Sequence, residues 1–160
     1  MAAFSALFAP EAQATPGGPA KANSMNRLDL LIVLQNAYRP GGRAIPHVVW
    51  VKALWHSYTG KRLMEMIPEG TRIAVVNASP QVGTHAGSYF PADLPHLHAA
   101  IDETQPRLVL GCGKIAQEGL MELGIAHLPA PHPAWRGLSK KRTLQIRADI
   151  VRLLATQRGL

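Results

Sequence analysis

The sequence predicts an α/β protein, a three-layer αβα sandwich around a short, mostly parallel four-stranded sheet. Short apolar runs alternate with amphipathic segments of helical period, which indicates strands connected by helices. The runs are apolar at nearly every position, which is typical of parallel strands buried on both faces. A length of 160 residues, 47% of them hydrophobic, fits one domain with its own core.

Four segments are expected to form the strands, and each is too short or too rich in β-branched residues for an ordinary helix. They are residues 28–34, 72–76, 107–110 and 126–128. Helices are expected where apolar residues recur at spacings of three and four. These segments are residues 48–58, 94–104, 114–123 and 139–157.

Residues 25–160 are expected to form the single domain, and residues 1–24 a flexible tail rich in Ala, Pro and Gly. Ala12-Gln13-Ala14 resembles a signal-peptide cleavage site. However, no Lys or Arg precedes the short apolar stretch, and Pro10 and Glu11 interrupt it. The sequence therefore favours a tail over a secretion signal.

The charge balance points to an anionic partner. The net charge is +7 and the isoelectric point is about 10.1, which favours nucleic acid. Cys112 is the one cysteine, so neither an internal disulfide nor a cysteine-held metal cluster is expected. A reducing compartment fits, the cytoplasm or the nucleoid or nucleus. No apolar run reaches the roughly 18 residues of a membrane span.

Polar residues follow each expected strand, where ligands bind in parallel sheets. Residues 35–38, 77–80 and 111–113 follow the first three, and the loop of His132 follows the fourth. Asn36 or Asn77 alone could simply satisfy backbone groups in a turn. Two asparagines and a histidine at strand ends instead suggest a binding site. An amide can bind a base edge or a water, and an imidazole can stabilise a leaving oxygen.

Other motifs predict no cofactor. Residues 111–114, GCGK, lack the spacing of a phosphate loop and are interpreted as a tight strand-to-helix turn, with Cys112 packed and unreactive. The seven histidines do not have metal-ligand spacing, and His96 and His98 are interpreted as surface or structural residues.

Three segments resemble the uracil-DNA glycosylase superfamily, and the similarity extends over about residues 28–154. LQNAYR (34–39) is similar to the family's water-activating loop, Gly-Gln-Asp-Pro-Tyr-His in many members. VVNA (75–78), followed by HAGS (85–88), is similar to the strand whose terminal Asn recognises uracil. PHPA (131–134) is similar to the catalytic His-Pro-Ser loop.

The chain departs from the family pattern at several positions. Asn36 stands where many members have Asp, although the mismatch-specific and single-strand-selective branches have Asn there. Slower hydrolysis is implied. Leu34, Ala37 and Ala134 replace Gly, Pro and a phosphate-holding Ser.

The resemblance implies a monomeric DNA glycosylase that flips and hydrolytically excises uracil or a related damaged base, without metal or cofactor. Asn36 would hold the attacking water, and His132 would stabilise charge on the pyrimidine O2. Gln35, Tyr38 and Asn77 would bind the base, with Tyr38 excluding the thymine methyl group. The implied DNA-binding residues are Ser79, Trp135, Arg136, Leu138, Ser139, Lys140, Lys141 and Arg142.

The segment 131–142 fits this implied role. Its two prolines would fix the backbone around His132, and Trp135, Arg136 or Leu138 would wedge into the gap left by a flipped base. The basic turn after Ser139 would bind phosphates, or else Ser139 is an ordinary helix cap before a solvated turn.

Two other functions remain open. One is a DNA-binding relative that recognises a base without excising it. The other is an α/β enzyme that acts on free nucleosides or nucleotides.

Overall fold

The computed structural model describes residues 27–157, so the expected tail lies outside the described residues. Four strands form one sheet in the order β2-β1-β3-β4, and every neighbouring pair is parallel. The strands are β1 (Leu30–Leu34), β2 (Ile73–Asn77), β3 (Leu108–Cys112) and β4 (Leu128–Ala130). The helices are α2 (His47–His56), α3 (Tyr58–Met66), α4 (Leu94–Thr104), α5 (Lys114–Glu122) and α6 (Lys140–Thr156).

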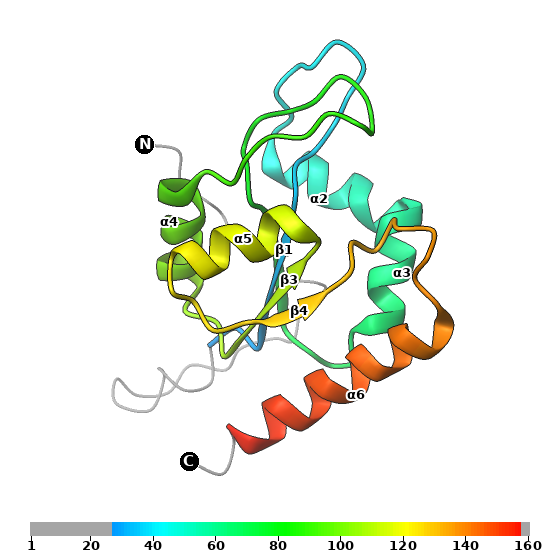
Figure 1. Ribbon diagram of the computed structural model, residues 1–160, viewed down its shortest axis with the longest axis vertical. Helices are drawn as coiled ribbons and strands as arrows, with labels where there is room; N and C mark the ends of the chain where they lie inside the picture. The colour runs from blue at the N-terminus through cyan, green and yellow to red at the C-terminus, as the bar shows by residue number, and fades with distance from the viewer. Residues whose placement is uncertain (1–26, 158–160) are drawn as a thin grey trace, which may run out of the picture.

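Helices cover both faces of the sheet, so the predicted α/β class is confirmed (Figure 1). Central strand β1 shows how the layers arise from alternation along a strand. Leu30, Ile32 and Leu34 pack into one buried cluster with side chains of α2, α3 and α6. Leu31 and Val33 pack into a second cluster with α4 and α5. Because β1 is buried on both faces, it has no room for a polar residue.

The strand order places a switch point between β1 and β3. From β1 the chain crosses to β2 on one side, and then returns past β1 to reach β3 and β4 on the other. The loops that leave β1 and β3 therefore diverge at the carboxyl end of the sheet. In open α/β sheets, ligands bind in the crevice that this divergence opens.

Three element predictions were wrong in detail. The helix expected over 48–58 is interrupted at Ser57, where α2 ends and α3 begins. The Ser57 hydroxyl donates to the Leu54 carbonyl at 2.6 Å and accepts from the Gly60 N–H at 3.1 Å, so one residue ends the first helix and caps the second. Gly111 and Cys112, expected in a turn, are the last residues of β3 and pair with β4.

The fourth strand lies at Leu128–Ala130 rather than at 126–128. His127 instead lies just before the strand, with its Nδ1 2.9 Å from the Ile125 carbonyl oxygen. Pro129 is tolerated within β4 because this strand lies at the edge of the sheet. Cys112 is fully buried, and burial raises the pKa of its thiol to about 12, which confirms a packed, unreactive residue.

A buried charge cluster lies at the amino end of the sheet. The Asp29 carboxylate precedes β1 and accepts hydrogen bonds from the backbone N–H and guanidinium of Arg72 and from the guanidinium of Arg107. Arg107 also donates to the Leu154 carbonyl at 2.8 Å, which joins the sheet to α6. In the described part of the chain, no helix is long and apolar enough to cross a membrane.

Candidate functional site

The loops that follow β1 and β2 lie side by side above the carboxyl end of the sheet (Figure 1). Backbone bonds join them: the Arg39 N–H donates to the Gly83 carbonyl at 2.7 Å, and the Gly83 N–H to the Ala37 carbonyl at 2.9 Å. The Ser79 N–H donates to the Gln35 carbonyl at 3.0 Å. These bonds continue the pairing of the two strands beyond their ends and hold residues 35–39 in place.

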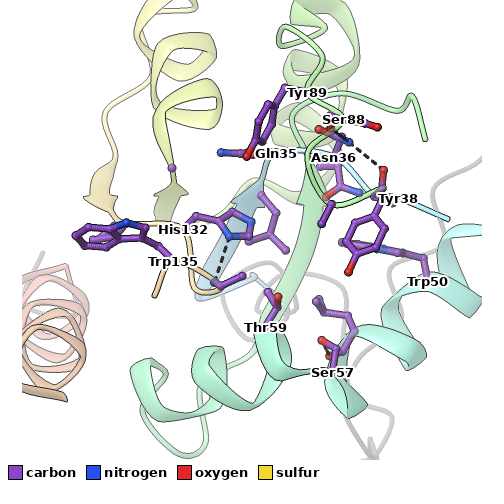
Figure 2. Close-up of a pocket in the computed structure, with 18 of the residues that line it drawn as sticks. Gln35, Asn36, Tyr38, Trp50, Ser57, Thr59, Ser88, Tyr89, His132 and Trp135 are labelled. Carbon is purple, nitrogen blue, oxygen red and sulfur yellow. Dashed lines mark hydrogen bonds between the residues drawn. The ribbon is translucent and has the colours of Figure 1, made fainter. Parts of the chain in front are cut away.

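A cavity of about 1470 Å³ opens at this end of the sheet, larger than the 300–1,000 Å³ typical of small-molecule sites. Its lining includes residues that follow all four strands, so the predicted convergence at strand ends is confirmed. The predicted site residues among them are Gln35, Asn36, Tyr38, Asn77, His132, Trp135, Arg136 and Arg142. Figure 2 shows Gln35, Asn36 and His132 gathered around this space.

The amide nitrogen of Asn36 is committed to the protein. It donates to the Ala37 carbonyl at 2.9 Å and to the Ser88 carbonyl at 3.0 Å (Figure 2). Because both protons on the nitrogen are used, the amide orientation is determined. Its oxygen accepts no hydrogen bond from the described residues and remains available as an acceptor beside the cavity.

The Asn77 carboxamide also has an oxygen without a partner, but this oxygen is buried. Its Oδ1 is buried, and among the described residues it is the one buried side-chain polar atom without a hydrogen-bond partner. The backbone carbonyl of Asn77 lies 3.1 Å from Nε2 of His96, so α4 holds the main chain in place. An unsatisfied buried amide costs about 1–3 kcal/mol. A ligand that pairs with this amide would recover that energy.

His132 presents a neutral imidazole with a defined tautomer. The Ala134 backbone N–H donates to Nδ1 of His132 at 3.2 Å, so the ring proton of the neutral form lies on Nε2. Burial lowers the pKa of His132 below its ordinary 6.5, which favours this neutral form at pH 7. The ring points toward the Asn36 side of the cavity (Figure 2). His132 is therefore a hydrogen-bond donor rather than a cation.

Gly113 lets the ends of three strands approach closely. Its φ of +88° is a conformation that favours glycine. A Cβ atom at this position would lie 2.9 Å from Nε2 of Gln35 and 3.3 Å from Cβ of His132. The Gly113 N–H also donates to the Ala130 carbonyl at 2.8 Å. A side chain at residue 113 would displace a predicted base-binding residue and a predicted catalytic residue together.

The cavity lining is cationic. Arg39, Lys114, Arg136 and Arg142 contribute to it, and none of the described lining residues is Asp or Glu. Lys114 is partly balanced by Glu118, with its Nζ 3.6 Å from a carboxylate oxygen in an exposed pair. Such a lining favours an anionic ligand over a neutral or cationic one.

Two predicted DNA-binding residues are corrected by their burial. The Leu138 side chain is 4% exposed and packs in the core with Ile146 and Ile150 of α6, so it cannot serve as a wedge. Its position just before the helix cap could have indicated this, since that residue commonly packs against the first turns. Ser79 is 1% exposed and its hydroxyl accepts from the Gln81 N–H at 3.3 Å, so it offers no side chain to DNA.

The start of α6 has features of both predicted roles, a helix cap and a phosphate-binding turn. Ser139 is the helix cap, and its hydroxyl accepts from the Arg142 N–H at 3.1 Å. Lys140 forms an exposed ion pair with Glu65 of α3 at 3.1 Å. Lys141 and Arg142 form no ion pair with the described residues, and Arg142 lines the cavity. Lys141 and Arg142 are therefore more available to a phosphate than Lys140, which is already paired with Glu65.

Several lining residues were not found from the sequence. Gln117 of α5 donates through Nε2 to the Gly111 carbonyl at 3.2 Å and to the Ala130 carbonyl at 2.8 Å. It thereby joins the ends of β3 and β4 just before the His132 loop. The sequence feature that could have indicated Gln117 is its position one turn after Gly113, at the start of the expected helix. Trp50 and Tyr89 also line the cavity, and nothing in their local sequence distinguished them from packed or exposed aromatics.

No group of three or more potential metal-ligating side chains occurs among residues 27–157. Comparisons of the chain with protein-family models, curated proteins and solved structures found no match. The function must therefore be inferred from the geometry of the cavity and from the three sequence motifs.

Proposed function

We propose that this protein is a DNA glycosylase that excises uracil or a related deaminated base. One observation gives the main support: three polar groups with defined hydrogen-bonding states lie around one cationic cavity. They are Asn36 with a free oxygen, Asn77 with a buried amide oxygen that has no partner, and His132 with a donor Nε2. A pyrimidine base attached to DNA needs groups of these kinds.

Binding of the base rests on Asn77 and an aromatic ring. The Asn77 amide offers a donor and an acceptor, which complement the donor and acceptor on a pyrimidine edge. Trp50 is the best anchored of the aromatic side chains that line the cavity, because it is partly buried and packs against the core. Its ring is also supported by His47, at a centroid distance of 5.6 Å. We assign base stacking to Trp50.

Cleavage then rests on His132 and Asn36. As the bond between the base nitrogen and the sugar carbon breaks, its electron pair moves to the base and negative charge develops on O2. The Nε2–H of His132 donates to that oxygen, and the oxygen of Asn36 orients a water toward the sugar carbon. The water supplies the new hydroxyl of the sugar. Its proton leaves to solvent, because an amide is not basic enough to accept it.

A second candidate, an enzyme acting on free nucleotides, is favoured by the same cations. Arg39, Arg136 and Arg142 line the cavity and would bind the phosphate of a mononucleotide as well as that of DNA. Lys140 and Lys141 of α6 lie outside the cavity lining, and these further cations favour a polymer with more than one phosphate.

The test is incubation with oligonucleotides that carry uracil, hypoxanthine, xanthine or 5-hydroxymethyluracil, followed by alkaline cleavage at abasic sites. We expect strand breaks at one or more of these bases, and at least tenfold fewer with His132→Ala. A parallel assay follows free deoxyuridine monophosphate. Release of base from the mononucleotide alone would support the second candidate. Binding without release from any substrate would leave a base-recognising protein and refute the proposed activity.

A further inference from the structure

Three aromatic side chains of the cavity lining are unusually exposed. Tyr38, Tyr89 and Trp135 are 57%, 65% and 56% exposed, and they come from the segments that follow β1, β2 and β4. Figure 2 shows Trp135 and Tyr38 on opposite sides of His132, with Tyr89 on the side of Gln35. These rings contribute little to the core. Their exposure in three separate segments around one opening suggests a binding surface.

Trp135 is held in position although it is exposed. A Cβ atom at Gly137 would lie 2.3 Å from Cζ2 of Trp135, so one face of the indole rests on the main chain of Gly137. The turn beneath it is closed by the Trp135 N–H to the His132 carbonyl at 2.9 Å, and by the Leu138 N–H to the Trp135 carbonyl at 3.1 Å. The guanidinium of Arg62 in α3 holds the carbonyl of buried Leu138. The outer indole face is thus preorganised for a planar ligand.

Cations alternate with these rings along the chain. Arg39 follows Tyr38 and Arg136 follows Trp135, and both cations line the cavity with Arg142. Positive grooves with exposed aromatics bind single-stranded nucleic acid, because unpaired bases stack on the rings while phosphates contact the cations. A duplex keeps its bases stacked on one another, so it offers at most the single gap of a flipped base.

Resting on the proposed function, we propose that the substrate is single-stranded DNA. The nucleotides that flank the target base stack on Trp135 and Tyr89, and their phosphates contact Arg136, Arg142 and Arg39. The size of the cavity agrees with this proposal, since about 1470 Å³ exceeds the space that one base requires. Trp135 is then a stacking platform rather than a wedge for duplex DNA.

The test measures affinity by fluorescence anisotropy at one fixed salt concentration, with a uracil-free single strand, the duplex of the same sequence, and the matching RNA. We expect the wild type to bind the single-stranded DNA at least tenfold more tightly than the duplex. Trp135→Ala and Tyr89→Ala should each weaken single-strand binding by roughly 5- to 100-fold, the usual range for loss of one base stack, with less than twofold effect on the duplex.

Two further variants complete the design. Trp135→Tyr retains a ring and should restore most of the affinity. Met121→Ala removes an exposed apolar side chain that does not line the cavity, and should leave binding unchanged. Equal weakening of single-strand and duplex binding by Trp135→Ala would make Trp135 a wedge and overturn the inference. Tighter binding of RNA than of DNA would overturn it as well.

The inference and the proposed function fail in distinguishable ways, because the DNA in this assay contains no uracil. Single-strand preference without base release in the excision assay would refute the glycosylase activity alone. Base release together with equal affinity for single strand and duplex would refute the single-strand inference alone.

Discussion

The two ends of the sheet use polar residues in opposite ways. At the amino end, Asp29 is 5% exposed and its carboxylate is fully engaged by Arg72 and Arg107. At the carboxyl end, Asn77 keeps a buried oxygen without a partner and Asn36 keeps a free acceptor. The central strands β1 and β3 between them are buried along their whole length. Polar groups that are satisfied within the protein stabilise the fold, whereas groups left unsatisfied are the candidates for contact with a ligand.

The electrostatic contrast is similar. Burial of the Asp29 carboxylate raises its pKa, but the hydrogen bonds and charge of Arg72 and the hydrogen bond from Arg107 outweigh burial, so the pKa of Asp29 lies below its ordinary value. The pKa of His132 is lowered by burial alone, without a charged partner. The two arginines keep Asp29 charged. Burial keeps His132 neutral, because none of the described residues places a charged partner beside it.

The largest expected effect is on stability at the amino end. Asp29→Ala leaves the guanidinium of Arg107, whose side chain is 14% exposed, without its carboxylate. Removing one partner of such a pair costs about 3–5 kcal/mol, measured by urea unfolding. Asp102→Ala is the control, because it removes an exposed carboxylate paired with His98 and should cost under about 0.5 kcal/mol. Equal effects of the two variants would contradict a supporting role for the amino end.

At the carboxyl end, the expected loss is in activity. His132→Ala removes the proposed donor to O2, and one preorganised donor is worth about 2.7–4 kcal/mol, or roughly 10²–10³ in rate. Single-turnover excision measures it, and the unfolding free energy should fall by less than about 1.5 kcal/mol, since one backbone hydrogen bond to Nδ1 is lost. His98→Ala is the matched control on the exposed face of α4. A wild-type rate in His132→Ala would remove this residue from the mechanism.

Gly113→Ala should lower the excision rate about tenfold, because the new methyl group presses on the side chain of Gln35 and on Cβ of His132. The positive φ adds a stability cost of about 1–2 kcal/mol. Gly124→Ala separates the two terms, since φ there is +67° and no atom lies within 4 Å of the added Cβ. We expect both variants to lose similar stability, and only Gly113→Ala to lose rate. Equal rates would mean that the approach of the strand ends does not position the site.

Acidification should affect the two ends in different pH ranges. Protonation of His132 puts a proton on Nδ1 and abolishes its bond from Ala134. The excision rate should therefore decrease as the pH falls through the lowered pKa of His132, which lies below 6.5, at most about tenfold per pH unit. Asp29 has a depressed pKa, so its contribution to stability is complete above 3.8 and is lost as pH falls through the lower folded value. If the excision rate and the unfolding free energy decreased in the same pH range, the two ends of the sheet would not differ in the way described.

Much of the fold was predictable from the sequence, because short buried strands are encoded locally by runs such as residues 30–34. The gathering of Asn36, Asn77 and His132 followed from the rule that parallel strands end together. The partners of these residues were not predictable. Ser88, which orients Asn36, lies 52 residues away, and the Lys140 pair with Glu65 spans 75 residues. Such contacts depend on how loops and helices pack, which no local pattern contains.

The smallest expected effect concerns the basic turn of α6, where the comparison is between neighbouring cations. Lys140 is paired with Glu65, whereas Lys141 and Arg142 have no ion-pair partner among the described residues. Each lost phosphate contact lowers the slope of log affinity against log salt by about 0.7 on a single strand. Lys141→Ala and Arg142→Ala should each reduce the slope by about that amount, and Lys140→Ala by less, because Glu65 competes with the phosphate. Glu65→Ala should then raise the contribution of Lys140 to that of its neighbours. If all three lysine and arginine variants leave the slope unchanged, the turn is a solvated face, and the proposed DNA binding must depend on the cations of the cavity alone.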